Sequence, residues 1–217
     1  MPPSTPEDLQ DSLDADLAWR RTEMQVIRSD VENIKPIDED SPRGRSVLRA
    51  GVALLYAHWE GFSKNACQAY LDYVSRRRLR ASDLSDSFVL LALTRAVRKL
   101  ESDPTSTESV LDFIRRTTEM RPQIPRQDVV LTESNLRFGV LCKVFRNLGL
   151  PLEAFEMRSQ LIDRSLCDAR NDIAHGKAMF PRRADYLDLH DEVLAMMEAV
   201  RDAVLNAVAT KAYRAPS

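Results

Sequence analysis

The sequence lacks the features that mark several common classes of protein. Its 217 residues contain only three cysteines, Cys67, Cys142 and Cys167, which are far apart and form no C-x-x-C pair. This spacing argues against a disulfide framework and against a zinc site, so we expect three buried thiols. No apolar run reaches the roughly 18 residues needed to span a bilayer, so we expect no membrane segment. The first residues, MPPSTPEDLQ, have no basic stretch and no apolar core follows, so we expect no secretory signal and a cytoplasmic location.

A strong charge of one sign is also missing. The formal net charge is −2, so no global field draws the protein onto nucleic acid, and any such contact has to come from local basic patches. Two runs are candidates for phosphate binding: SRRRLR at residues 75–80 and PRR at residues 181–183. Solvated helix ends would explain both runs equally well.

Glycine is scarce, with six residues, and the alternation of β-branched residues that marks strands is absent. The sequence therefore predicts an all-α fold. Periodicity and capping residues predict helices at residues 6–34, 45–77, 82–102, 107–118, 134–147, 151–174 and 185–211. The length suits one domain, in which residues 1–40 form an N-terminal helix that packs on a helical domain of residues 41–217.

One short stretch, CDARNDIAHGK at residues 167–177, raises the question of chemistry. Arg170 and His175 would point about 140° apart on an unbroken helix, so the helix has to end between them or close by. Gly176 is placed to provide that ending in the left-handed conformation. Asn171 lies four positions before His175 and can contact it. One interpretation is structural, with His175 stabilising the helix dipole and the last free carbonyls.

The spacing of one arginine and one histidine arises easily by chance in an arginine-rich chain, so the whole string carries the signal. RNDIAHG resembles the signature of the HEPN superfamily, in which an arginine, a polar residue and a histidine end one helix of a small bundle. LLYAHWEGFSKNACQAYLDYV and DYLDLHDEVLAMMEAV extend the similarity, which covers residues 45–210 with gaps. These segments look like the prokaryotic branch found beside restriction, toxin–antitoxin and phage-defence genes. Some toxins of that branch have a tyrosine where this chain has Lys177, so a step assigned to that tyrosine lacks its residue here.

The resemblance implies a HEPN-like bundle of long antiparallel helices and a metal-independent endoribonuclease that needs no cofactor. Such a protein would be a toxin or defence effector that acts on RNA as a homodimer, its two motifs meeting in one cleft, with an antitoxin or restriction component as partner protein. The alternative is a non-catalytic HEPN-like module that binds RNA, a nucleotide or a partner protein, because fold does not determine function.

The predicted catalytic residues are Arg170, Asn171 and His175. RNA carries its own nucleophile, the 2′-hydroxyl, so the protein has to move protons and stabilise phosphorane charge. An imidazole titrates near pH 6.5 and suits the proton transfers at His175. The planar fork of Arg170 matches two phosphate oxygens, and Asn171 would orient the imidazole. No acidic cluster with metal-ligand spacing is evident, and we predict no metal ligand.

Other polar residues are weaker candidates. His58 and Glu60 in AHWEGF lie about 160° apart around their helix, so at most one of them can face a given cleft. Trp59 and Phe62 in the same segment are expected in the core. His190 stands among acidic residues in an amphipathic segment, and we expect it at the surface or in an interface.

Overall fold

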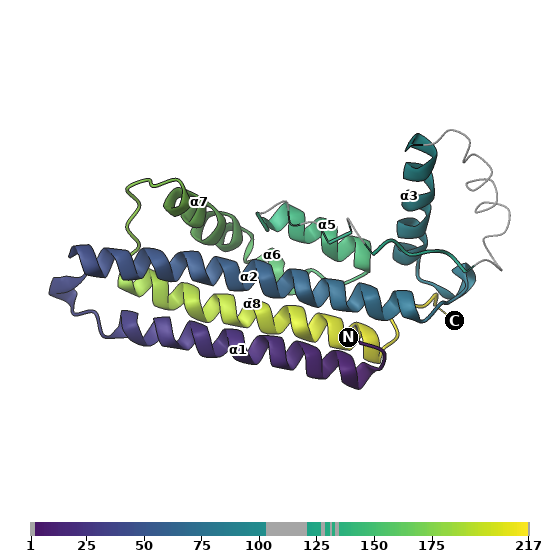
Figure 1. Ribbon diagram of the computed structural model, residues 1–217, viewed down its shortest axis with the longest axis horizontal. Coiled ribbons are helices and arrows are strands. Elements are labelled where there is room, and N and C mark those ends of the chain that lie inside the picture. The colour runs from purple at the N-terminus through teal and green to yellow at the C-terminus, as the bar shows by residue number, and fades with distance from the viewer. Residues whose placement is uncertain (1–2, 103–120, 127–128, 131, 133–134, 217) are drawn as a thin grey trace.

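A computed structural model describes residues 3–102, 121–126, 129–130, 132 and 135–216 (Figure 1). This part of the chain is helical and contains no strand beyond one isolated bridge between Leu84 and Arg214, which confirms the all-α prediction. The helix predicted at residues 107–118 lies outside the described residues. Among the helices that are described, none combines the length and the apolar character needed to cross a membrane.

Three long helices form the body of the molecule: α1 (Pro6–Glu32), α2 (Pro42–Arg76) and α8 (Arg183–Ala209). Each packs against the other two, and α1 runs antiparallel to both α2 and α8 (Figure 1). Their bounds agree closely with the predicted ones. Helix α1 packs against α2 and α8, while the division of the chain into residues 1–40 and a helical domain of residues 41–217 stays a prediction.

Local side-chain chemistry sets where the long helices begin. The Thr5 hydroxyl accepts a hydrogen bond from the Asp8 backbone N–H at 3.0 Å, and the Asp8 carboxylate accepts one from the Thr5 N–H at 3.0 Å. This capping box, with Pro6 in the first turn, satisfies donors that the helix itself leaves open. Ser41 caps α2 in the same way by accepting from the Gly44 N–H at 3.1 Å, and the turn η1 (Pro36–Asp38) joins the two helices.

Shorter helices pack against α2 and α8 on the side of the bundle that faces away from α1 (Figure 1). They are α5 (Phe138–Leu148), the single turn α6 (Glu153–Glu156), the π-helical segment η4 (Leu161–Asp168) and α7 (Ala169–Ala174), which continues η4 without a break. The turn η2 (Ala81–Asp83) leads into α3 (Asp86–Ser102), which stands at the C-terminal end of α2. Two predicted helices therefore differ from the structure: α5 begins at Phe138, and residues 151–174 are interrupted after Glu156.

The core confirms part of the sequence analysis and corrects one residue. Trp59 and Phe62 are fully buried, and all three cysteines are buried free thiols. Of the two places expected for His190, the surface or an interface, the surface is wrong, because the residue is only 3% exposed. Arg28 of α1 contacts the His190 Nδ1 at 2.9 Å, and Asp191 Oδ1 lies 3.0 Å from the same nitrogen. Since α8 packs against two long helices, even this polar part of its surface is covered.

Candidate functional site

The site begins where α7 ends. The last helical residue is Ala174, His175 is the C-cap, and Gly176 follows with a φ of 71°. A positive φ costs glycine little, because it has no Cβ to collide with the following carbonyl. The helix therefore ends at the motif, as the spacing of Arg170 and His175 predicts.

Backbone N–H groups bind three of the carbonyls at this helix end. Three hydrogen bonds do so: His175 N–H to Asn171 C=O at 2.9 Å, Gly176 N–H to Ile173 C=O at 3.1 Å, and Lys177 N–H to Asp172 C=O at 2.9 Å. The last two form the pattern of a Schellman motif, which closes a helix without help from any side chain. The imidazole of His175 is consequently not needed to bind these carbonyls.

The His175 side chain is exposed and, among the described residues, makes no side-chain hydrogen bond. The other two histidines of the chain are 2% and 3% exposed and contact α1 residues in the interior. His175 is thus the one histidine of the three that solvent and a substrate can reach.

Arg170 lies half-buried against α2. Its guanidinium carbon sits 3.9 Å from the centre of the Tyr56 ring, a distance typical of a cation–π contact. Burial raises the pKa of the Tyr56 phenol to about 12, although the N–H of Leu136 and the Arg170 side chain both act to lower it. Tyr56 is therefore neutral at physiological pH and presents a fixed aromatic face that holds the guanidinium plane in place.

The π-helical segment η4 immediately precedes Arg170 and is anchored from α5. The Asp163 carboxylate accepts a hydrogen bond from the Phe138 N–H, the first of α5, at 2.7 Å, and Asp168 pairs with Arg137. A π-helical turn holds more residues than an α-helical one, so it changes the direction in which every later side chain leaves the helix. Such segments are uncommon and are found often at functional sites.

The segment after His175 is fastened to α2 by Arg49. This arginine donates hydrogen bonds to the carbonyls of Lys177 and Met179, both at 2.7 Å, and to that of Ile173 at 3.5 Å. The ring of Phe180, 45% exposed, lies 5.7 Å from the Arg49 guanidinium. Arg49 therefore joins the end of α7 and the following loop to the same helix that carries Tyr56.

The structure brings the predicted residues together only in part. Arg170 is turned toward α2, whereas His175 stands exposed at the helix end. Asn171 is half-buried, and the backbone bond given above is the hydrogen bond that joins it to His175 in the described structure. The orienting contact between the Asn171 amide and the imidazole stays a prediction.

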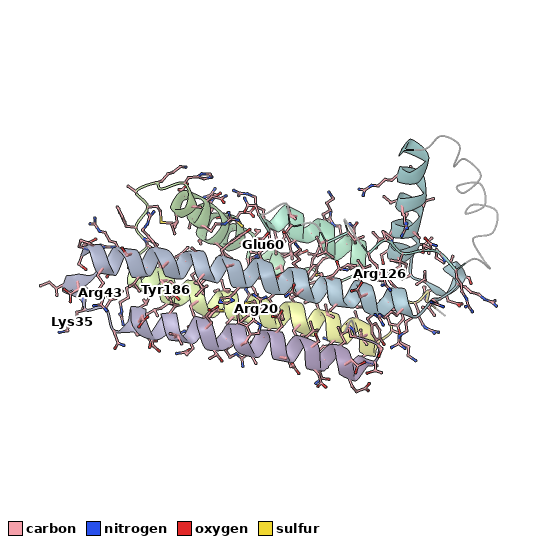
Figure 2. The ribbon with its side chains drawn as sticks, viewed as in Figure 1. Arg20, Lys35, Arg43, Glu60, Arg126 and Tyr186 are labelled. Atoms are coloured by element: carbon pink, nitrogen blue, oxygen red, sulfur yellow. The ribbon has the colours of Figure 1, made fainter. Side chains whose placement is uncertain are left out.

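His58 and Glu60 lie on different sides of α2, as their spacing predicts. His58 is buried against α1, with its Nδ1 3.5 Å from Arg20 and its Nε2 3.0 Å from Glu23. Glu60 is half-buried one turn after Tyr56, and its negative charge acts to raise the pKa of that phenol. Figure 2 shows Glu60 on the side of α2 where α5 and α7 lie, so Glu60 and not His58 shares the motif's surroundings.

Sequence reasoning missed Tyr56 and Arg49. A signal for them existed, because Arg49, Tyr56 and Glu60 follow each other at intervals of seven and four residues and so share one side of α2. Three polar side chains on one side of a helix with many buried residues indicate that this side faces something other than a plain apolar core. In the described part of the chain, no group of three His, Cys, Asp or Glu side chains is placed so that it could hold a metal ion.

Comparison with known proteins adds one finding. The family model described as MAE_28990-like HEPN matches residues 9–213, which include α2, α8, all but the first three residues of α1, and the RNDIAHG motif. Searches of curated proteins and of solved structures found no match.

Proposed function

The chain belongs to the MAE_28990-like HEPN family, and from this premise we propose that it is a metal-independent endoribonuclease. A HEPN domain indicates a nuclease-type or RNA-related module. The observation that carries the proposal is the exposed imidazole of His175 on a helix end that backbone bonds have already closed. A histidine placed only to cap the helix would have carbonyls to bind, and here the Schellman motif occupies them.

The proposed reaction uses the RNA's own nucleophile. A neutral imidazole takes the proton of the ribose 2′-hydroxyl, the 2′-oxygen attacks the adjacent phosphorus, and the bond from phosphorus to the 5′-oxygen breaks. The departing 5′-oxygen receives a proton from an acid, so the products are a 2′,3′-cyclic phosphate and a 5′-hydroxyl. Arg170 binds the non-bridging phosphate oxygens, with its guanidinium plane held by Tyr56.

A second copy of the chain would supply what one copy lacks. The reaction needs a base and an acid, and one chain offers a single exposed histidine. A homodimer in which two α7 ends meet would place one His175 as base and the other as acid, with an Arg170 from each subunit for the phosphate. In the cell we propose a cytoplasmic toxin or defence effector, restrained by an antitoxin or a restriction-system partner, as the resemblance to that HEPN branch implies.

The experiment that tests the proposed function uses two matched RNA substrates. One is all-ribose, and the other has a single 2′-deoxy sugar at the mapped cut site, which removes the nucleophile and leaves the phosphate charge unchanged. We expect cleavage of the first, with cyclic phosphate ends and no effect of EDTA, and no cleavage of the second at that bond. If the deoxy substrate is cut there at the normal rate, or if EDTA stops the reaction, then water or a metal hydroxide is the nucleophile and the proposal is wrong.

A further inference from the structure

A second feature lies far from the motif, at the C-terminal end of α2. A cleft of about 980 Å³ opens between the end of α2, one side of α3, residues 121–126 and the C-terminal half of α5. Figure 2 shows Arg126, one of its lining residues, beside the base of α3, whereas Glu60 marks the motif's surroundings farther back along α2. The cleft and the motif are therefore two separate places on one side of the molecule.

Positive charge lines this cleft. Its lining includes five arginines and one lysine, all of them exposed: Arg78, Arg95, Arg98, Arg121, Arg126 and Lys143. None of the lining residues given by the described structure is acidic. A chain with a net charge of −2 thus concentrates six cations around one concave surface, and low-dielectric walls strengthen the field inside such a surface.

These cations come from distant parts of the chain. Arg78 belongs to the SRRRLR run that the sequence marks as a candidate phosphate site, and Ser75 of the same run also lines the cleft. The PRR run has a different role, because Arg183 donates to the carbonyls of Val31 and Glu32 at the end of α1, at 3.2 and 3.1 Å. Folding therefore selects one of the two basic runs for the cleft.

The composition of the lining indicates which kind of anion it suits. No aromatic ring is found among the described lining residues, so the cleft offers no surface on which a base could stack. The neutral lining consists of six apolar residues and four polar ones, which are Ser75, Thr94, Gln123 and Asn147. Many cations without base-reading groups are typical of binding to a phosphate backbone, which is independent of sequence and sensitive to salt. A nucleotide pocket would need contacts to one base and usually encloses most of its ligand.

We propose that this cleft is a binding site for the phosphate backbone of RNA, separate from the Arg170–His175 motif. The inference rests on the proposed function in one respect, because it takes the RNA bound in the cleft to be the RNA that is cleaved at the motif. The path along α2 from Tyr56 at the motif to Ser75 at the cleft covers 19 residues, or roughly 28 Å at about 1.5 Å per residue. At about 3.4 Å per stacked nucleotide, roughly eight nucleotides separate the two places. Short RNAs should therefore reach one of them and longer RNAs both.

The experiment measures binding of a fluorescent 20-nucleotide 2′-O-methyl RNA, which cannot undergo 2′-hydroxyl attack, to the full chain at several salt concentrations. The test variant is Arg95→Gln/Arg98→Gln on α3. The matched control is Lys35→Gln/Arg43→Gln, which removes two exposed cations at the opposite end of the molecule (Figure 2). A second test variant, Lys143→Gln, removes a lining cation that lies on a different helix, α5.

We expect the α3 pair to weaken binding about tenfold or more, because one solvent-exposed ion pair contributes roughly fivefold. The slope of log affinity against log salt should fall by about 1.4, at about 0.7 per lost phosphate contact on a single strand. The control pair should stay within about twofold of the wild type. In a parallel cleavage assay with all-ribose substrates, the α3 pair should slow cleavage of a six-nucleotide RNA much less than cleavage of a 20-mer.

Several results would overturn the inference. The first is that the α3 pair and the control pair weaken RNA binding equally. The second is that the α3 pair or Lys143→Gln leaves RNA binding unchanged in a chain that melts like the wild type. The third is that a 20-residue polyglutamate binds as tightly as the RNA, which would indicate an acidic protein as occupant. Failure of the nuclease proposal is visible separately. If no RNA is cut and the 20-mer still needs the α3 arginines for binding, the nuclease proposal fails and the cleft inference holds. If RNA is cut and the α3 pair does not change RNA binding, only the cleft inference fails.

Discussion

Arg49→Met should loosen the loop that follows His175 while leaving the long helices intact. Arg49 holds this loop through two hydrogen bonds of 2.7 Å to carbonyl oxygens and a longer one of 3.5 Å. A hydrogen bond from a charged donor contributes about 1.5–3 kcal/mol when buried, but these carbonyls are near solvent and can bind water instead. We therefore expect the variant to lower the free energy that holds the loop in place by about 1–2 kcal/mol in total. Methionine keeps much of the aliphatic length, so the change removes mainly the donors.

The assay is amide hydrogen exchange of peptides that cover residues 174–182, read together with RNA cleavage. The Met179 N–H, which bonds the Lys177 carbonyl at 2.9 Å, should exchange roughly tenfold faster, since about 1.4 kcal/mol corresponds to a factor of ten. Peptides from α2 and α8 should be unchanged. Cleavage should fall by about tenfold or more, because small displacements of a catalytic group are costly to rate.

The matched control is Arg45→Met. The Arg45 guanidinium lies 4.5 Å from the Phe180 ring and pairs with Asp40, but it donates to none of the loop carbonyls in the described structure. Exchange in the loop should therefore stay near the wild-type rate. If Arg45→Met speeds exchange as much as Arg49→Met does, contact with Phe180 holds the loop and the role given to the carbonyl bonds is refuted.

The remaining predictions concern the motif, its dimer and the buried His58. His175→Ala should lower RNA cleavage by about 10²-fold or more, yet change the free energy of unfolding by less than about 1 kcal/mol, because backbone bonds close the helix end. Cleavage at the wild-type rate would mean that His175 has only a structural role. Arg170→Lys should also cleave RNA poorly, because lysine lacks the planar guanidinium that stacks on Tyr56. Light scattering at micromolar concentration should give a dimer, and a monomer that still cleaves would exclude the two-subunit site. Gly176→Ala should lower the free energy of unfolding by about 1–2 kcal/mol, seen as a lower Tm, because the φ of 71° at this position is strained for alanine. No atom lies within 4 Å of the added Cβ, so the strain comes from the backbone. An unchanged Tm would mean that the turn readily adopts another conformation. Burial, with a smaller effect from the Arg20 charge, holds the pKa of His58 below its usual 6.5. The unfolded chain therefore binds a proton at His58 before the folded chain does, and the free energy of unfolding should fall as the pH drops below about 6.5, by at most about 1.4 kcal/mol per pH unit. This contribution should be absent in His58→Gln, and denaturant titrations at pH 5–7 that give wild type and variant the same dependence of unfolding free energy on pH would contradict the prediction.

The long helices and the end of α7 could be read from the sequence because local interactions decide them. Thr5 with Asp8, and Ser41 with Pro42, start α1 and α2 through contacts between near neighbours in the chain. Gly176 ends α7 because a positive φ suits glycine wherever it stands. The same locality made Arg170 and His175 recognisable, since their string and its place at a helix end are features of one short segment.

Contacts between distant segments decided the rest, and the periodicity of one helix does not reveal which other helix will cover it. The stack of Arg170 on Tyr56 and the bonds from Arg49 to the loop after His175 join positions more than 100 residues apart. His190 is buried because α1 covers α8 with Arg28, which nothing around His190 in the sequence foretells. The six cations of the basic cleft come from four segments, and only packing of α2, α3 and α5 gives them a common concave surface. The amino-acid sequence was enough to predict the three long helices and the Arg170–His175 motif, because those depend on neighbours along the chain. What faces the motif and where positive charge gathers depend on which helices meet, so only the folded structure reveals them.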